Sequence, residues 1–410
     1  MELLGKSKDE LREMCVAMGE PAYRGGQIYH ALYAERKFAF AQMTNLPASL
    51  RERLAKEATI TLPAVKQRFA STDGSVRYLF ALGETETNRV CTERTVDNEG
   101  TEKRKPPRPA SVEAVFMPSE GRQTICVSTQ AGCAVDCQFC MTAQLGLIRN
   151  LTAGEIVGQV LVALEEDRRT RIANGELQDA GLKPGATQST TQSKTQSTVQ
   201  ARQRDRVQTN VVLMGQGEPL LNYEAVMAAL RILLDRAGVG IAPRHATLST
   251  SGIVPGIERL AGETLRPKLA ISLNASSDEQ RNALMPINKK YPLRVLLEAC
   301  KKFPRGTREY VTFEYVLLGG VNDSPEDARR VAKMMTDLGR VKVNLIPWNP
   351  GALPFSEPDQ GRVAAFHKIL LDRGVPVFTR YSRGRDVMAA CGQLALMQIE
   401  NSQPSAPDVG

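Results

Sequence analysis

Three cysteines lie within eight residues in the first half of the chain: Cys133, Cys137 and Cys140. A loop of this length can bring three thiolates to one inorganic centre, because the ligands of an iron–sulfur cluster must lie close together. Zinc would need a fourth ligand, and none of the three histidines of the chain is nearby in the sequence. A four-iron cluster held by three cysteines keeps one iron without a protein ligand. The pattern therefore predicts a [4Fe–4S] cluster with one open position for a small molecule.

The spacing of these cysteines, with three residues and then two between them, resembles the motif of the radical S-adenosylmethionine (SAM) enzymes. In those enzymes the amino and carboxylate groups of SAM chelate the fourth iron. The resemblance therefore implies SAM as a cofactor. A disulfide framework, the other common use of clustered cysteines, does not suit a chain of 410 residues without a secretory signal.

The composition sets outer limits on the function. The 410 residues, 42% of them hydrophobic, suffice for one large domain and a small one. No apolar run approaches membrane-spanning length and the first residues lack the layout of a signal peptide, so we expect a cytoplasmic protein without membrane contact. In that reducing compartment, eight cysteines indicate metal or redox chemistry. The net charge of +8 is compatible with a nucleic-acid partner, although many basic proteins bind none.

The first 60 residues read as a small helical module. Ser7 and Glu10 form a capping box, and apolar residues follow at helical spacing. Further helices are expected over residues 26–35 and from about Pro47 onward. Basic residues decorate the module, so its surface either grips RNA or is simply a solvated face.

Residues 61–118 connect this module to the rest of the chain. A hairpin is expected over residues 65–70 and 76–82, and a polar segment at 84–110 reads as an exposed loop or insertion. In the strand that follows, Glu113 would share an apolar face with Val115 and Met117. Such a carboxylate is either a salt-bridge partner or a group held ready for proton transfer.

From residue 124 the chain alternates between strand and helix. The expected strands cover residues 124–128, 210–214, 246–249, 268–273, 310–318, 341–346 and 375–378. Thr152, Asn222 and Ser324 are expected to cap the helices between them. Repetition of this kind builds a parallel sheet, and six units suggest an open, partial barrel with its ligand site at the carboxyl ends of the strands.

The expected fold is therefore α/β, a partial (β/α)6 barrel with a small N-terminal helical domain. Its parts are residues 1–60, the hairpin and linker at 61–118, the barrel at 119–385 and a C-terminal segment at 386–410. A low-complexity tract at about 168–208 is too polar to offset the entropy of ordering and is expected to be a disordered insertion. The polar tail from residue 401 is expected to be loose.

Polar residues follow several strands of the expected barrel. Gly217 lets the backbone approach a ligand, and Glu218 can accept hydrogen bonds from an ammonium group, although a Gly-Glu-Pro sequence also suits an ordinary turn. Because the strands are parallel, their carboxyl ends meet in one pocket. The remaining candidates for cofactor binding there are Ser249, Ser272, Leu273, Asn274 and Asn349.

Two further thiols are candidates for chemistry. Cys126 lies in the first barrel strand, seven residues before the cysteine loop. Small neighbours surround Cys391 and leave room for a bulky reactant. Cys15 and Cys300 fall within helical patterns and are expected to be core residues.

Several motifs taken together resemble the RlmN family of 23S rRNA and tRNA adenine-C2 methyltransferases. The match extends over nearly the whole chain, including the N-terminal module. The motifs are the cysteine loop with Thr142-Ala-Gln144, the run from Met214 to Asn222, Leu248 to Gly252, Pro286 to Tyr291, Asn344 to Pro350, and Ala390 to Leu394.

The resemblance implies a role for each thiol. Two SAM molecules are used in turn, one as methyl donor and one as radical source. Cys391 takes the methyl group, a 5′-deoxyadenosyl radical removes a hydrogen from it, and the carbon radical adds to carbon 2 of adenine. Cys126 then attacks Cys391 and releases the product with a transient disulfide, while Glu113 matches the proton acceptor. Glu218 would hold the SAM amino group.

The resemblance also implies substrates and partners. These are an adenosine in the peptidyl transferase centre of 23S rRNA, the adenosine 3′ of the anticodon in tRNA, and an electron donor such as flavodoxin or ferredoxin. A monomer is expected. Two features depart from the family: Asn274 stands where histidine is common, from which we expect altered SAM affinity, and the insertions at 84–110 and 168–208 are unusual.

Two alternative functions remain open. A sister family methylates adenine at carbon 8 with the same cysteines, although Gln144 and the Lys289-Lys290-Tyr291 run favour carbon 2. A non-catalytic RNA-binding iron–sulfur protein is the alternative from another class. Mass spectrometry of nucleosides from treated RNA would separate all three.

Overall fold

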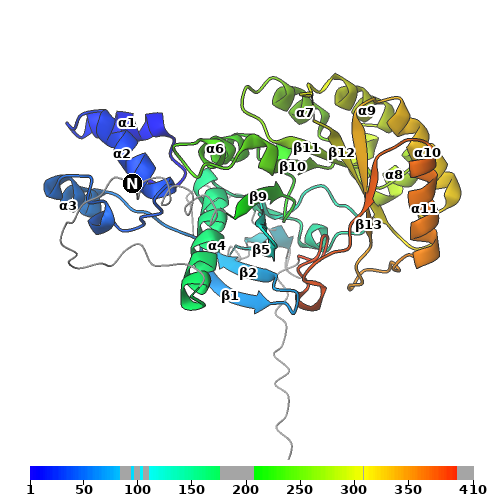
Figure 1. The fold of residues 1–410 in the computed structure, drawn as a ribbon, viewed down its shortest axis with the longest axis horizontal. Helices are drawn as coiled ribbons and strands as arrows, with labels where there is room; N and C mark the ends of the chain where they lie inside the picture. Colours follow the sequence, from blue (N-terminus) through cyan, green and yellow to red (C-terminus); the bar gives the residue numbers. More distant parts are fainter. Residues whose placement is uncertain (84–93, 97–101, 105–109, 176–206, 308, 395–410) are drawn as a thin grey trace, which may run out of the picture.

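A ten-stranded mixed sheet forms the centre of the computed structural model, which describes residues 1–83, 94–96, 102–104, 110–175, 207–307 and 309–394 (Figure 1). The order of the strands in space follows their order in the chain. They are β1 (Ala64–Ala70), β2 (Val76–Ala81), β5 (Ser111–Ser119), β6 (Arg122–Cys126), β9 (Gln208–Leu213), β10 (Ala246–Thr250), β11 (Lys268–Ser272), β12 (Val311–Leu317), β13 (Val341–Pro347) and β14 (Val377–Thr379).

The second part of this sheet is parallel and the first part is antiparallel. β1, β2, β5 and β6 pair in antiparallel fashion, whereas β6, β9, β10, β11, β12, β13 and β14 pair in parallel. Parallel neighbours need a crossover, and helices supply it. These helices are α4 (Ala153–Ala173), α6 (Tyr223–Leu234), α7 (Val254–Ala261), α8 (Asp278–Leu284), α9 (Leu293–Lys302), α10 (Pro325–Thr336) and α11 (Gln360–Asp372).

The parallel part forms six strand–helix units and a final strand, and β1 and β14 are the two edges of the whole sheet in the described chain. The expected α/β fold with an open, partial (β/α)6 barrel is thereby confirmed. Apolar alternation explains how the sheet is covered. In β13, for example, Val341, Val343 and Leu345 are buried, whereas Lys342 and Asn344 between them are only partly buried.

The expected helix caps are largely confirmed. Ser7, Thr152 and Ser324 each form a complete capping box at the start of α1 (Lys8–Ala17), α4 and α10. Asn222 immediately precedes α6, but the expectation that its side chain caps the helix was wrong. Its amide instead donates to the carbonyls of Thr129 and Leu151, both at 2.8 Å. It therefore joins two loops at the carboxyl end of the sheet.

The N-terminal module consists of α1, α2 (Tyr23–Tyr33) and α3 (Ala48–Glu57), and it lies at one end of the molecule beside α4 (Figure 1). Gly5 and Gly154 meet so closely that a Cβ on Gly5 would lie 2.8 Å from Gly154 Cα. The Tyr33 hydroxyl accepts from the Gly5 N–H at 2.9 Å. One continuous hydrophobic cluster extends from this module into the barrel, so the module packs firmly against it.

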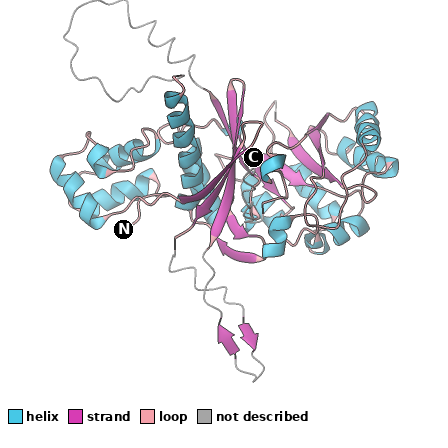
Figure 2. Cartoon of the chain, turned by 90° about the horizontal axis from the view of Figure 1, so that it is seen from below, coloured by secondary structure: helices cyan, strands magenta, loops and turns pink. Residues whose placement is uncertain are grey.

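The two expected insertions fall partly outside the described residues. Helix α4 continues to Ala173, so the expected start of the disordered insertion at about residue 168 was wrong. Residues 176–206 are outside the described chain, as are Cys91 and the tail from residue 401. Within 84–110, β3 (Arg94–Val96) and β4 (Glu102–Arg104) pair antiparallel as a sheet of their own (Figure 2). None of the helices in the described ranges is both long and apolar enough to span a membrane.

Two adjacent glycines in α2 give a test of how α1 and α2 pack. A Cβ on Gly25 would overlap the backbone of Leu11 and Arg12, whereas one on Gly26 would lie 3.5 Å from the Lys8 side chain. Gly26→Ala should stabilise the protein by about 0.5–1 kcal/mol because alanine has the higher helix propensity. Gly25→Ala should lower the free energy of unfolding by on the order of 3 kcal/mol because α1 is pushed away. Urea unfolding measures both, and equal effects would show that the close helix contact is absent.

Candidate active site

A cavity lies at the carboxyl ends of the parallel strands, where ligand sites in open parallel sheets are found. It gathers most of the side chains that the sequence singled out. They are Cys133, Cys137, Cys140, Gly217, Glu218, Ser249, Ser272, Asn274 and Cys391. Residues that are far apart in the sequence therefore line one cavity.

Four of the expected site residues do not line this cavity. Leu273 is fully buried and its N–H donates to the Glu314 carbonyl at 2.9 Å. The Asn349 amide donates to the Ser382 hydroxyl at 2.8 Å. Cys126 and Glu113 lie elsewhere, as described below. Leu273 and Asn349 thus hold loops that border the cavity, and their side chains are not part of its wall.

The cysteine loop lies between β7 (Gln130–Gly132) and β8 (Leu147–Asn150), which pair antiparallel. Gly132 has a φ of 73°, and a Cβ there would overlap the Gly146 carbonyl oxygen, so this position needs glycine. The same carbonyl accepts from the Cys133 N–H at 2.9 Å. On the other side of the loop, the Gln138 N–H donates to the Leu284 carbonyl at 2.9 Å. The loop is therefore anchored at both ends.

Burial favours the protonated form of two of these thiols. Burial raises the pKa of Cys133 to about 12 and the pKa of Cys137 well above its usual value. Within the described residues, no group of three His, Cys, Asp or Glu side chains is spaced for a single metal ion. A four-iron cluster needs a different arrangement of ligands, because each thiolate ligates a different iron. Three thiols around one cavity fit that donor set.

Glu218 is a buried carboxylate in the wall of the same cavity. It accepts hydrogen bonds from the N–H and hydroxyl of Ser251, both at 2.7 Å, and from the Leu220 N–H at 3.1 Å. Burial nevertheless raises the pKa of Glu218, so a cation beside it would favour the charged form. The Gln130 side chain accepts from the Glu218 N–H at 2.8 Å. Sequence reasoning missed Ser251 and Gln130, whose partners are far away in the chain.

Arg281 is another residue that the sequence did not single out. Its side chain is fully buried. The guanidinium donates to the carbonyls of Ser251 and Ser272, at 2.6 and 3.1 Å, and also to Leu273 O and Asn288 Oδ1. It thus joins the loops after β10 and β11 to α8. Burial lowers its pKa to about 10.

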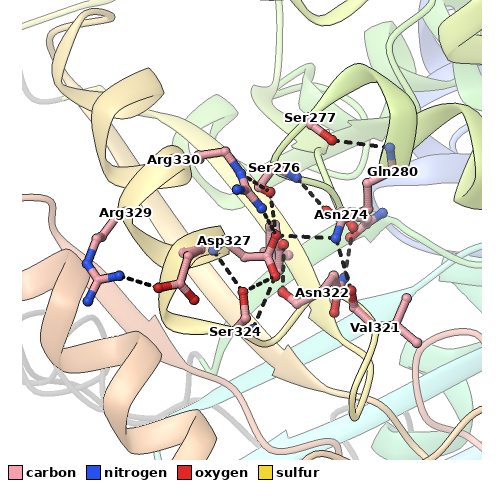
Figure 3. A network of polar contacts seen from close by, with 12 residues as sticks. Asn274, Ser276, Ser277, Gln280, Val321, Asn322, Ser324, Asp327, Arg329 and Arg330 are labelled. Carbon is pink, nitrogen blue, oxygen red and sulfur yellow. Dashed lines mark hydrogen bonds and ion pairs between the residues drawn. The ribbon is translucent and has the colours of Figure 1, made fainter.

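Asn274 lies in the left-handed backbone region, with a φ of 55°. Its Oδ1 accepts from the Val316 N–H at 2.8 Å, and its carbonyl accepts from the Asn322 amide at 2.8 Å. Among the described residues, its own NH2 group has a weak acceptor alone, the Met285 sulfur, at 3.4 Å. In Figure 3 the contact between Asn274 and Asn322 lies next to the polar network around Asp327 on α10. Gln280 joins that network to the carbonyl of Val321, the residue before Asn322. The oxygen of this amide is therefore held by a strong hydrogen bond, whereas its NH2 group has a weak partner that a ligand could replace.

The C-terminal segment places Cys391 beside the cysteine loop. The Met141 N–H donates to the Gly392 carbonyl at 2.9 Å, and the Thr142 hydroxyl donates to the Leu394 carbonyl at 2.6 Å. Burial and the Glu314 carboxylate raise the pKa of Cys391 to about 11. Its surface is nevertheless exposed to the cavity.

A second cavity of about 330 Å³ borders the first and contains Cys126. This volume lies in the range of small-molecule sites. Cys391, Cys140 and Met214 belong to both walls, so the two cavities are direct neighbours. Burial and the neighbouring Cys391 raise the pKa of Cys126.

Glu113 lies on the expected face of β5 but lines neither cavity. Its carboxylate forms a fully buried ion pair with Arg77 on β2 and accepts from the Gln216 amide at 3.2 Å. Arg77 in turn lies over the Phe69 ring, with its guanidinium carbon 4.0 Å from the ring centre. The salt-bridge interpretation of this carboxylate therefore describes what the structure shows.

The thiol loop, the barrel and the cavity at its carboxyl end together define a radical SAM enzyme. A family model of the radical SAM superfamily matches residues 189–334. The model of the ribosomal RNA large subunit methyltransferase N-terminal domain matches residues 1–60. The structure is similar to the crystal structure of a radical SAM methyltransferase from Sphaerobacter thermophilus, with a TM-score of 0.77, 40% identity, and coverage of 96% of this chain and 99% of that one.

Curated relatives identify the family within the radical SAM enzymes. The chain is 46% identical to the probable dual-specificity RNA methyltransferase RlmN of Koribacter versatilis, over 93% of this chain and 98% of that protein. It is 39% identical to the dual-specificity RNA methyltransferase RlmN of Geobacter sulfurreducens, over 96% of this chain and 92% of that protein. The chain therefore belongs to the RlmN family of radical SAM methyltransferases. Its cofactors are a [4Fe–4S] cluster and SAM.

Two glycines of the cysteine loop give a matched pair of variants. Both have a positive φ, but a Cβ on Gly146 would meet no atom within 4 Å, whereas one on Gly132 would overlap Gly146. Gly146→Ala should lower the free energy of unfolding by about 1–3 kcal/mol, through backbone strain alone. Gly132→Ala should lower the free energy of unfolding further, and it should displace Cys133. Anaerobic reconstitution of this variant with iron and sulfide should therefore give little cluster absorbance. Full cluster absorbance in Gly132→Ala would show that this close approach does not position the loop.

Removing the buried guanidinium gives a second test. Arg281→Met leaves the carbonyls of Ser251 and Ser272 without a donor, so unfolding should become easier by on the order of 3 kcal/mol. The control is Arg329→Met, because Arg329 is exposed on α10 and pairs with Glu326 on the same helix. Arg329→Met should change the free energy of unfolding by no more than about 0.5 kcal/mol. Urea unfolding compares them, and an equally small effect of both changes would contradict the role given to Arg281.

Proposed function

We propose that this chain methylates carbon 2 of an adenosine in 23S rRNA and of the adenosine 3′ of the anticodon in tRNA. One observation carries the proposal: a single cavity brings together the three thiols of the cysteine loop, Glu218 and the lone thiol of Cys391. The curated relatives support it, because they carry the name of dual-specificity RNA methyltransferases.

In this proposal, Cys133, Cys137 and Cys140 hold the cluster. Their positions around one cavity, with no fourth cysteine in the same loop, suit a cluster with one open iron. When bound, the cluster and SAM supply a carbon radical and a methyl group. Because the thiols must lose their protons to bind iron, cluster loading should release protons and become easier as the pH rises.

The SAM site that we propose lies beside Glu218, whose carboxylate is poised for an ammonium group. Gly217 has a φ of 98°, and a Cβ there would lie 2.5 Å from Gln130 Cβ, so the backbone can turn closely around the site. The other proposed contacts are Ser249, Ser272, Leu273, Asn274 and Asn349. For Leu273 and Asn349 the contact would be through the loops they hold.

The two lone thiols take different roles in the proposal. Cys391 carries the methyl group, since this residue lines both cavities. Cys126 lines only the second cavity and releases the product by attacking the Cys391 sulfur. Glu113 is our proposed proton acceptor, and its ion pair with Arg77 would have to open for it to take a proton from the adenine.

The partners that we propose beyond RNA follow from this chemistry. A one-electron donor such as flavodoxin or ferredoxin would reduce the cluster, and the enzyme would act as a monomer in the cytoplasm. The seven described cysteines are all free, as is common in a reducing compartment. The module of α1, α2 and α3 would help to grip RNA.

Product analysis tests the proposal directly. Reconstituted enzyme is incubated anaerobically with SAM, a strong reductant and an RNA hairpin, and the RNA is digested to nucleosides. We expect 2-methyladenosine by mass spectrometry, together with 5′-deoxyadenosine. Detection of 8-methyladenosine instead would assign the chain to the sister activity, and RNA binding without any product would support a non-catalytic protein.

The two thiol roles predict different failures. Cys126→Ala should trap protein joined to RNA through the Cys391 methylene, because no thiol remains to release it. A denaturing gel with labelled RNA should show this slow band, and the band should disappear in the double variant with Cys391→Ala. Cys300→Ala is the control, since that thiol is buried in α9 outside both cavities. Normal turnover by Cys126→Ala without a slow band would rule out its proposed role.

A further inference from the structure

A groove lies between the edge strand β14 and α11, directly beside the second cavity. Phe378, Arg380 and Tyr381 line it from the strand, and Gln360 and His367 line it from the helix. Arg380 and Tyr381 also line the second cavity, which contains Cys126 and Cys391. The groove and the proposed reaction site therefore share one wall.

The groove presents two aromatic rings to solvent, and one of them, Tyr381, belongs to the shared wall. Phe378 and Tyr381 are 45% and 58% exposed, whereas most large apolar side chains of the described chain are buried. Exposed rings of this size beside a pocket usually mark a binding surface. The Tyr381 hydroxyl hydrogen-bonds with Gln360 Oε1 at 3.1 Å, so the ring is held in place without being covered.

The charge of the groove is positive. The Arg380 guanidinium lies 5.2 Å from the centre of the Phe378 ring, and its Nε donates to Asn344 Oδ1 at 3.3 Å. No ion pair engages it within the described ranges, and no carboxylate is among the described residues that line the groove. Aromatic faces combined with an unpaired guanidinium are the features that bind single-stranded nucleic acid.

We propose that this groove binds the nucleotide next to the target adenosine, with its base on Phe378 or Tyr381 and its phosphate at Arg380. This inference rests on the proposed function. A target adenosine must leave its stack to expose carbon 2, so its neighbour loses a stacking partner. A ring on the wall between groove and cavity replaces that partner. Since every base has an aromatic face, such a contact tolerates different flanking sequences, as two kinds of RNA substrate require.

An RNA with one base missing tests the site. Three hairpins carry the target adenosine in the loop: one intact, one abasic at the 5′ neighbour and one abasic at the 3′ neighbour. Their affinities for the reconstituted enzyme are measured anaerobically. With the unchanged protein, one of the two abasic hairpins should bind about tenfold more weakly than the intact one, the scale of one lost stacking contact.

Variants of the protein test whether the two aromatic rings contact that base. Phe378→Ala with Tyr381→Ala should bind the intact hairpin about tenfold more weakly and should no longer distinguish the abasic hairpins. Tyr310→Ala is the control, since Tyr310 is 41% exposed just before β12 and lines neither the groove nor the cavities. It should bind all three hairpins as the unchanged protein does.

Two results would overturn the inference. The first is that neither abasic hairpin binds the unchanged protein more weakly, a result that does not depend on any variant folding. The second is that the double variant keeps the same discrimination, in which case the groove serves another occupant such as a protein partner. Nucleosides from the same samples report the methylated atom separately. A wrong product with base discrimination intact refutes the proposed function alone, and 2-methyladenosine without discrimination refutes this inference alone.

Discussion

The contact between the cysteine loop and the C-terminal segment is the constraint on which the site depends. Residues about 250 positions apart are joined by the Met141 N–H to Gly392 carbonyl bond and by the Thr142 hydroxyl to Leu394 carbonyl bond. Without this contact, Cys391 would not face the cavity that holds the three loop thiols. The barrel, the loop anchors and the buried polar groups around Arg281 can all be understood as support for this one juxtaposition.

The support reaches the C-terminal segment from the antiparallel part of the sheet as well. Asp73, in the turn between β1 and β2, accepts from the Gly384 N–H at 2.9 Å. Although burial opposes it, hydrogen bonds from Ser75 and Gly384 hold the pKa of Asp73 well below its usual range. A second contact joins the same two segments, because Asp386 accepts a hydrogen bond from the Ser71 hydroxyl at 2.6 Å. The hairpin that precedes the barrel therefore helps to position the segment that completes its cavity.

Periodic patterns and short spacings carried most of what the sequence revealed. Alternating burial in strands such as β13 and capping residues such as Ser324 are local, so they could be recognised without knowing the fold. The cysteine loop is also local, because all three thiols come from one turn of chain. Strand order then brought Glu218 and Ser249 to the same edge.

What sequence reasoning missed depends on partners far away in the chain. Arg281 looks like any helix residue until its carbonyl acceptors come together around it. Glu113 was placed on the right face of its strand, but alternation gives the face and not the neighbour, and the neighbour is Arg77. Asn222 suits a helix cap by type, yet two loop carbonyls take its amide. Long-range polar contacts of this kind have no periodic signature.

The pKa of Cys126 sets a requirement on the last step of the proposed reaction. It is raised first by burial and then by the proximity of Cys391, because two neighbouring thiolates repel one another. The raised pKa keeps Cys126 protonated near neutral pH, and a thiol is a weaker nucleophile than a thiolate. In the proposed reaction, Cys126 would therefore have to give up its proton to a base before it attacks the Cys391 sulfur.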